Sequence, residues 1–158
     1  MVEFADFQCR YCKKFFENTL GQLKETYINN GKMKLVFIGT KILGPESGDA
    51  TEAALCAGDQ AKFWQYHDLL YKNQQAANSG GFSLIKLSNM ARDLNLDMKQ
   101  FEECLGSRKY QKTVERNTEL SQKYQISGTP HFFIANSVIE GAQPSTTFEA
   151  AINPLIEP

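Results

Sequence analysis

Two cysteines stand close together near the start of the chain, in the stretch Phe7-Gln8-Cys9-Arg10-Tyr11-Cys12-Lys13-Lys14-Phe15-Phe16. They follow a short apolar run and open a helix-like pattern, so Cys9 is predicted to lie at a helix N-terminus. The first backbone N–H groups of a helix lack partners and its dipole is positive there, which stabilises a thiolate and lowers its pKa. Cys12 lies one turn further along, where it can reach the same sulfur and close a small disulfide. The same spacing begins many zinc sites, so the position between strand and helix is the more informative observation.

The composition predicts one domain, or one domain with a large insertion, with ample material for a core. The chain has 158 residues, of which 42% are hydrophobic and eleven are Phe. Its net charge of −1 gives no reason to propose nucleic acid or an anionic membrane as a partner. Four cysteines permit two disulfides and weakly favour an oxidising compartment.

Targeting signals are not visible in the sequence. No apolar run reaches the roughly 18 residues of a membrane span. The chain opens almost directly into a strand and shows no signal peptide. Because Cys9 lies so near the start, we expect any export signal to lie outside this stretch of sequence.

The N-terminal part predicts a β-α-β unit. Residues 2–7 form the first predicted strand, and residues 33–38 form a second strand that is almost continuously apolar. Between them, residues 12–29 carry their apolar side chains at helical spacing. The crossover of such a unit is right-handed and its two strands are parallel.

The middle of the chain carries helix signals only, separated by Gly, Asn and Ser. Helices are predicted over residues 49–74, 83–94, 98–105 and 108–124. The first of these would be one long helix with a bend near Gly58. Asp97 is the predicted N-cap of the third.

The C-terminal part returns to strands and defines the predicted architecture. After a turn that ends at Pro130, strands are predicted over residues 131–135 and 137–141, and a final helix over residues 146–156. The predicted fold class is therefore α/β, with βαβ and ββα halves in the order of a thioredoxin core and an all-helical insertion between them. The predicted boundaries are residues 1–45 and 126–158 for the core and residues 46–125 for the insertion.

Three groups of residues, taken together, resemble one known family. They are Glu3-Phe4 with Asp6-Phe7-Gln8-Cys9-x-x-Cys12, then Ala54-Leu55-Cys56-Ala57 with Phe63-Trp64-Gln65-Tyr66-His67-Asp68, and finally Gly128-Thr129-Pro130 before Phe132-Phe133. They are similar to the DsbA-like branch of the thioredoxin superfamily, and the resemblance spans essentially the whole chain. The first and last groups, separated by a helical block of the right size, are far more specific together than either is alone.

The resemblance implies thiol–disulfide exchange on unfolded or reduced protein substrates in the bacterial envelope. The protein would be periplasmic or otherwise extracytoplasmic, and a monomer without a cofactor, a metal or a nucleic-acid partner. A membrane quinone reductase of the DsbB or VKOR type would receive its electrons.

The resemblance also implies a role for each residue of the C-x-x-C motif. Cys9 would be the nucleophile that forms a mixed disulfide with the substrate, and Cys12 the thiol that resolves it. Arg10 and Tyr11 would tune the thiolate. Many relatives have Pro-Tyr or Pro-His there, so Arg10 departs from the family pattern. Its cation favours a thiolate at Cys9, unless the side chain points to solvent, where screening leaves little effect.

Thr129 and Pro130 match the family loop that faces the two cysteines. Pro130 would follow a cis peptide bond, which is common only before proline. The Thr129 backbone would pair with an extended substrate strand. Isomerase relatives have Thr before this proline, and so do several oxidases, which leaves the choice between oxidase and isomerase open.

Glu3 lies where the superfamily often holds a buried acid that passes protons to the resolving cysteine. Burial in a central strand would raise its pKa toward the range of a general base; the alternative is a frayed, exposed residue near the start of the chain. His131 follows Pro130 and could approach the sulfurs or simply pack at the rim of the core. His67 is interpreted as structural.

Cys56 and Cys104 form the second pair of cysteines. Relatives exist in which the corresponding helices are joined by a disulfide, which would contribute roughly 4 kcal/mol for a loop of this length in the chain-entropy model. The alternative is two buried free thiols that act as small hydrophobic side chains. A four-cysteine zinc site is disfavoured because this pair lacks the close spacing of structural zinc ligands.

Two alternatives to a disulfide-forming oxidase remain open. One is a disulfide isomerase or reductase, which Thr129 favours. The other is a non-enzymatic metal-binding or chaperone module that uses the same sulfurs. The same fold with an inserted helical block is also found in glutathione-dependent transferases and isomerases. Those typically have Ser at the nucleophile position, so Cys9 with Cys12 argues against them.

Overall fold

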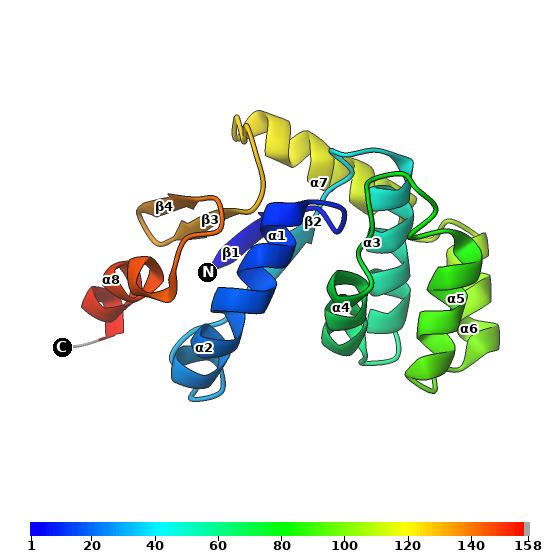
Figure 1. The fold of residues 1–158 in the computed structure, drawn as a ribbon, viewed down its shortest axis with the longest axis horizontal. Coiled ribbons are helices and arrows are strands. Elements are labelled where there is room, and N and C mark those ends of the chain that lie inside the picture. Colours follow the sequence, from blue (N-terminus) through cyan, green and yellow to red (C-terminus); the bar gives the residue numbers. More distant parts are fainter. Residues whose placement is uncertain (157–158) are drawn as a thin grey trace.

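The computed structural model of the protein describes residues 1–156 and is built around one four-stranded sheet (Figure 1). The strands are β1 (Val2–Ala5), β2 (Val36–Gly39), β3 (His131–Ile134) and β4 (Ser137–Glu140). Their spatial order is β2-β1-β3-β4, with β1 parallel to β2 and antiparallel to β3, and β3 antiparallel to β4. The predicted βαβ and ββα halves are therefore present and share one sheet.

One long helical run packs on the sheet directly after the cysteine motif. It consists of α1 (Arg10–Phe15), the π-helical turn η1 (Phe16–Leu20), α2 (Gly21–Leu23) and a second π-helical turn η2 (Lys24–Ile28). Its buried side chains share a core with β3 and with α8 (Ser145–Ile156), and this core contains Phe15, Leu20, Leu23, Tyr27, Phe132, Ile134, Ile139, Phe148 and Ile152. The first helical run and α8 therefore cover the same face of the sheet.

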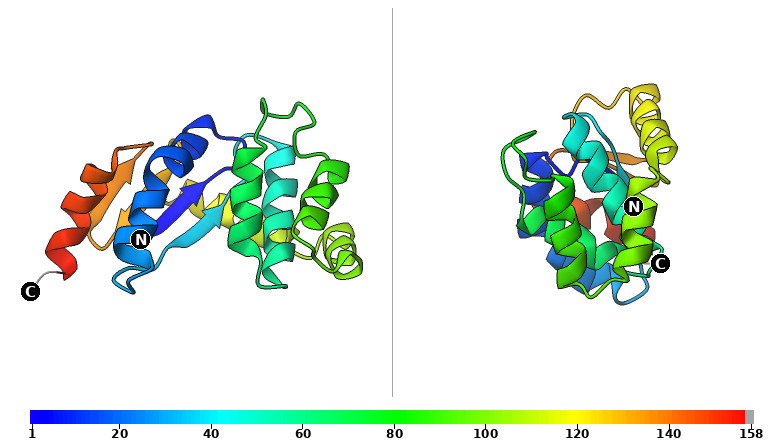
Figure 2. Two further views of the ribbon diagram at one scale, coloured as in Figure 1. Left: turned by 60° about the horizontal axis from the view of Figure 1, so that its bottom comes forward. Right: turned by 90° about the vertical axis from the view of Figure 1, so that its right-hand side faces the viewer.

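A block of helices stands beside the sheet, between β2 and β3 in the sequence. Its members are α3 (Pro45–Gly58), α4 (Phe63–Lys72), α5 (Leu84–Asp93), α6 (Met98–Gly106) and α7 (Gln111–Lys123). Figure 2 shows α5 and α6 at one end of the molecule and α8 at the other, with the sheet between. α7 returns to the second face of the sheet, where Asn117 Nδ2 donates to the Gly39 carbonyl at 3.0 Å and the Tyr124 ring meets those of Phe4 and Phe133.

The predicted single helix over residues 49–74 is wrong, because two helices stand there. The chain leaves α3 through a turn in which Ala61 adopts a left-handed backbone, with φ 57°. The Lys62 N–H donates to the Ala57 carbonyl at 2.9 Å and the Ala61 N–H to the Gly58 carbonyl at 2.9 Å, the bonds of a helix-ending Schellman motif. Both helices bury their apolar residues in one core, so the periodicity continues across the turn.

The remaining differences from prediction concern the ends of elements. The second predicted strand began at residue 33, but β2 begins only at Val36. The predicted N-cap Asp97 is confirmed, since its side chain accepts from the Gln100 N–H at 3.0 Å. The α/β fold class is confirmed, while the boundaries of core and insertion stay a prediction. The last two residues of the predicted core segment, 157 and 158, lie outside the described part of the chain.

Candidate active site

Cys9 and Cys12 meet at the junction of β1 and α1. Cys9 is the N-cap of α1, with an extended backbone at φ −76° and ψ 118°, and Cys12 lies in the first helical turn. A tight turn aims them, because the Cys9 N–H donates to the Asp6 carbonyl at 3.0 Å while the Cys9 carbonyl accepts from the Lys13 N–H at 3.1 Å. Both are free thiols; Cys12 is fully buried and Cys9 is 8% exposed. Cys9 is therefore the sulfur that a partner can reach.

The Thr129–Pro130 loop faces Cys9 from the far end of the sequence. The Thr129–Pro130 peptide bond is cis. The Cys9 thiol donates to the Thr129 carbonyl, with 3.2 Å between sulfur and oxygen, across 120 positions of sequence. The pairing of β1 with β3 places this loop there, since β3 begins directly after Pro130.

The two sulfurs differ strongly in acidity. The pKa of Cys9 is lowered to about 6, first by the hydrogen bond from the Cys12 thiol and then by the Thr129 side chain and the backbone N–H groups of Cys12 and Tyr11, against an opposing effect of burial. The pKa of Cys12 is raised well above its usual value, first by burial and then by its bond to Cys9 and the negative charges of Cys9 and Glu3. The helix start therefore favours a thiolate on Cys9 and a protonated thiol on Cys12.

Glu3 lies in the central strand on the same sheet face as the buried Phe132. It is 1% exposed, so the alternative of a frayed surface residue is wrong. Burial raises the pKa of its carboxyl to about 8, against a smaller lowering by the Lys24 cation. Among residues 1–156, the buried Oε2 atom has no hydrogen-bond partner. A carboxyl in this state can both hold and release a proton near neutral pH.

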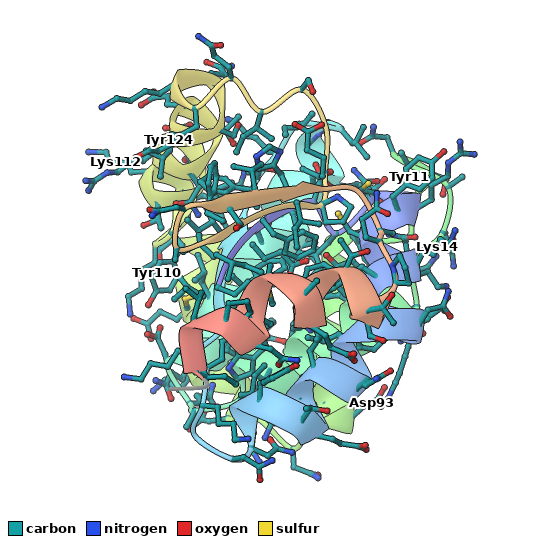
Figure 3. The ribbon with its side chains drawn as sticks, turned by 90° about the vertical axis from the view of Figure 1, so that its left-hand side faces the viewer. Tyr11, Lys14, Asp93, Tyr110, Lys112 and Tyr124 are labelled. Carbon is teal, nitrogen blue, oxygen red and sulfur yellow. A yellow bond between two sulfur atoms is a disulfide. The ribbon has the colours of Figure 1, made fainter. Side chains whose placement is uncertain are left out.

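Arg10 and Tyr11, the residues between the cysteines, point to solvent. The Arg10 guanidinium donates to the Tyr11 hydroxyl at 2.9 Å and stacks over the ring, 4.8 Å from its centre. Figure 3 shows Tyr11 and Lys14 projecting from the same side of α1. Hydrogen bonds to Cys9, and not the Arg10 charge, lower the pKa of that sulfur.

His131, the residue after Pro130, lies on the opposite face of the sheet from Glu3. Strand residues alternate between faces, and the His131 ring lies 5.0 Å from that of Phe133, tilted by 51°. Burial lowers its pKa. His67 lies within the core of the helical block and is 1% exposed.

Gln74, which the sequence did not single out, holds the cysteine loop from the helical block. Its amide nitrogen donates to the Phe7 carbonyl at 2.7 Å and to the Cys9 carbonyl at 3.1 Å. The contacts span 67 and 65 positions of sequence, so only the fold brings them together.

Gln8, inside the motif, makes a second link to the helical block. Its side chain donates to Ser47 Oγ at 2.8 Å and accepts from the Asn78 N–H at 2.6 Å. Asp6 supports this loop by accepting from the N–H groups of Gln8 at 2.8 Å and Leu43 at 2.9 Å. In the sequence alone, Gln8 is a polar residue beside the first cysteine, and such a residue is expected to be exposed to solvent.

A groove of about 430 Å³ runs past the site. Its walls come from α1 and from the loops on either side of the β3–β4 hairpin, and include Tyr11, Lys14, Gly128, Thr129, Glu140 and Gln143. One residue of this wall, Thr129, contacts Cys9 through its carbonyl, so the groove lies next to the cysteine site.

The other two cysteines form a disulfide between α3 and α6. Cys56 and Cys104 are bonded, with 5.9 Å between their Cα atoms. The alternative of two free thiols is therefore wrong for this pair. Within residues 1–156, no cluster of three or more His, Cys, Asp or Glu side chains could hold a metal ion. In the same part of the chain, no helix has both the length and the apolar character needed to cross a bilayer.

Comparisons with known proteins agree with this geometry. Residues 1–154 match the family model described as thioredoxin. The chain is 30% identical to the probable disulfide bond formation protein D of Bacillus anthracis, over 85% of this chain and 64% of that protein. This chain therefore spans slightly less than two thirds of the length of that relative.

Solved structures share the whole fold. The oxidised crystal structure of BdbD from Bacillus subtilis has a TM-score of 0.90 at 22% identity, covering 99% of this chain and 86% of that one. The thiol-disulfide exchange protein alpha-DsbA2 from Wolbachia pipientis has a TM-score of 0.83 at 24% identity, covering 98% of this chain and 80% of that one. The resemblance stated from the sequence is confirmed, and the chain belongs to the thioredoxin family, with DsbA-like structures as its neighbours.

Proposed function

We propose that this chain is a thiol:disulfide oxidoreductase that introduces disulfides into exported protein substrates through Cys9 and Cys12. The observation that carries the proposal is the unequal pair. Cys9 has a pKa of about 6 and contacts Thr129, while the pKa of the buried Cys12 is raised. The Cys9 sulfur is suited to exchange with a partner, and the Cys12 sulfur is suited to remain a protonated thiol.

The reaction begins with the Cys9–Cys12 disulfide. A substrate thiolate attacks Cys9 Sγ, the Cys9–Cys12 bond breaks, and its electron pair leaves on Cys12, which takes up a proton. A second substrate thiolate then attacks the substrate sulfur of the mixed disulfide, and Cys9 departs as a thiolate. The substrate loses two electrons and two thiol protons, and the protein gains the two electrons. A low pKa at Cys9 makes it a good leaving group for this second step.

The pKa of Cys9 also bears on the direction of exchange. Its value of about 6 falls between about 3.5 for DsbA and about 7 for thioredoxin. A lower thiolate pKa stabilises the reduced protein and makes its disulfide a stronger oxidant. This intermediate value favours an oxidant weaker than DsbA. A disulfide isomerase or reductase is the second candidate, which Thr129 also favours.

The proposal extends to location and partners. The closed disulfide between Cys56 and Cys104 fits an extracytoplasmic, oxidising compartment such as the periplasm. The substrates would be unfolded or reduced proteins bound in the groove beside Thr129. A membrane quinone reductase of the DsbB or VKOR type would reoxidise the monomeric protein.

The test is oxidation of a reduced model protein, with the redox potential measured against glutathione. We expect oxidation by the wild type, a potential above about −270 mV, the thioredoxin value, and loss of oxidation to background in Cys9→Ser. A potential at or below the thioredoxin value without oxidase activity would defeat the oxidase. Recovery of activity from a scrambled-disulfide substrate would then identify an isomerase. Tight zinc binding by the reduced protein, seen by native mass spectrometry, would point to the metal-binding alternative.

A further inference from the structure

Tyr71 is a buried tyrosine whose hydroxyl has no assigned use. It lies on α4, is 1% exposed, and its oxygen finds no hydrogen-bond partner among the described side chains and backbone. Tyr66, on the same helix, is equally buried, but its hydroxyl donates to the Leu87 carbonyl at 2.8 Å. An unpartnered polar group in a protein interior is destabilising and calls for an explanation.

The Tyr71 ring packs against residues on both sides of the two cysteines in the sequence. The ring stacks on Phe16, one turn after Cys12, with 5.4 Å between centroids. It also lies 5.1 Å from the ring of Phe7, two positions before Cys9.

The backbone fixes this arrangement. The Gln74 N–H donates to the Tyr71 carbonyl at 3.3 Å, while the Gln74 side chain binds the Phe7 and Cys9 carbonyls. The end of α4, which carries Tyr71, is thus fastened to the cysteine loop.

The ionisable groups around Tyr71 come from several elements. The pKa of Tyr71 is raised well above its usual value, first by burial and then by the negative charges of Cys12, Glu3, Asp6 and Cys9. His67, on the same helix, has its ring 4.9 Å away and a pKa lowered by burial. The Lys24 cation acts on both Glu3 and His67. In such surroundings the Tyr71 hydroxyl keeps its proton and is available as a hydrogen-bond donor.

We propose that Tyr71 is a positioning residue of the cysteine site, whose hydroxyl donates a hydrogen bond to the anion that forms on the Cys12–Glu3 pair during exchange. This inference rests on the proposed function. When the Cys9–Cys12 bond breaks, its electron pair goes to Cys12, which takes the proton of Glu3 and leaves a carboxylate. Tyr71 loses no proton. A donor held in place before the charge appears stabilises it without reorganisation, and this explains why the hydroxyl is unpartnered in the dithiol state.

The test compares Tyr71→Phe with Tyr66→Phe, which removes a hydroxyl of equal burial from the same helix. Glu3 and Cys12 are followed by ¹³C NMR of the reduced protein across pH, because the two titrate as a coupled pair. Loss of a hydrogen bond to a charged group should raise the apparent pKa of the pair by about one unit in Tyr71→Phe. Tyr66→Phe should leave it unchanged.

For unfolding in urea, we expect Tyr66→Phe to have the larger destabilising effect of the two variants. Tyr71→Phe removes an unsatisfied group and should unfold at the same or a higher urea concentration than the wild type. Tyr66→Phe leaves the Leu87 carbonyl without its donor and should unfold at a lower concentration. A titration of Tyr71→Phe that coincides with that of the wild type, or moves downward, would overturn the inference.

Oxidation of a reduced model protein separates this inference from the proposed function. If the wild type oxidises and Tyr71→Phe shows no titration shift, the Tyr71 inference alone fails. If the wild type does not oxidise but the shift appears, the proposed function fails, and Tyr71 still acts on the Cys12–Glu3 pair.

Discussion

The four cysteines form two pairs with contrasting surroundings. Cys9 and Cys12 are free thiols at a strand–helix junction, with their pKa values moved in opposite directions. Cys56 and Cys104 are bonded to each other between two helices, 48 positions apart. The first pair encloses almost no chain, so its bond adds little to stability and is free to open and close. The second closes a long loop, where a cross-link stabilises most.

Polar side chains near the two pairs make different contacts. Beside the reactive pair, Glu3 and Tyr71 each hold a buried oxygen with no hydrogen-bond partner in the described part of the chain. Beside the bonded pair, Asp59 accepts from Lys109 at 2.8 Å and from Tyr110 at 2.6 Å, and so ties the end of α3 to the segment after α6. The buried Glu52 Oε2, one turn before Cys56 on α3, also lacks a hydrogen-bond partner in the described part of the chain, so unsatisfied buried oxygens lie near both pairs.

The largest effect should come from removing the bonded pair. Cys56→Ala with Cys104→Ala should lower the free energy of unfolding by about 4 kcal/mol, the chain-entropy value for a loop of this length. Urea unfolding measures it. The reactive pair should be unaffected, with a Cys9 pKa still about 6 and oxidation of a reduced model protein retained by the folded variant. If the folded variant lost that activity, the two pairs could not be treated as independent.

The next effect has the opposite sign and concerns Glu3. Its pKa is raised from 4.5 to about 8 in the folded protein. The neutral carboxyl therefore supports the fold fully below about pH 4.5, and this support is lost as pH rises through about 8. Glu3→Gln should remove the loss and gain on the order of 3 kcal/mol at the alkaline end.

Urea unfolding of the oxidised proteins measures the Glu3 effect, because no reactive thiol then titrates. The gain should be small near pH 5 and largest above pH 8, following the folded pKa of about 8. Glu119→Gln, a change at an exposed carboxyl, is the matched control and should show no such trend. Parallel pH curves for Glu3→Gln and the wild type would mean that Glu3 is not a buried, neutral acid.

The sequence was sufficient for the features that local chemistry determines. The position of Cys9 at a helix start and the βαβ and ββα halves follow from short motifs and from apolar periodicity, whereas the Thr129–Pro130 loop that faces Cys9 was implied by the family resemblance. The turn after Gly58 was missed because Ala61 takes the left-handed position, where Gly or Asn would have given the usual stop signal. The periodic pattern then continues into α4 without a break.

The polar contacts of the site could not be predicted for a different reason. Gln74 and Tyr71 lie on or just after α4, and nothing in their local sequence indicates a contact with a loop more than 60 positions earlier. Apolar patterns show which face of a helix is buried, but not which carbonyl or carboxyl a polar side chain meets there. These contacts depend on how the helical block sits against the sheet.

The smallest effect tests why the two thiols of the reactive pair differ. The hydrogen bond from Cys12 is the largest contribution to the lowered pKa of Cys9. Cys12→Ala removes this donor and should raise the Cys9 pKa by about one unit, the equivalent of about 1.4 kcal/mol. Cys12→Ser keeps a donor at the same place and should leave the pKa near 6. The rate of alkylation of Cys9 as a function of pH measures both. If the Cys9 pKa stayed near 6 in both variants, the low pKa would be assigned to the backbone N–H groups of the helix start and to Thr129 instead.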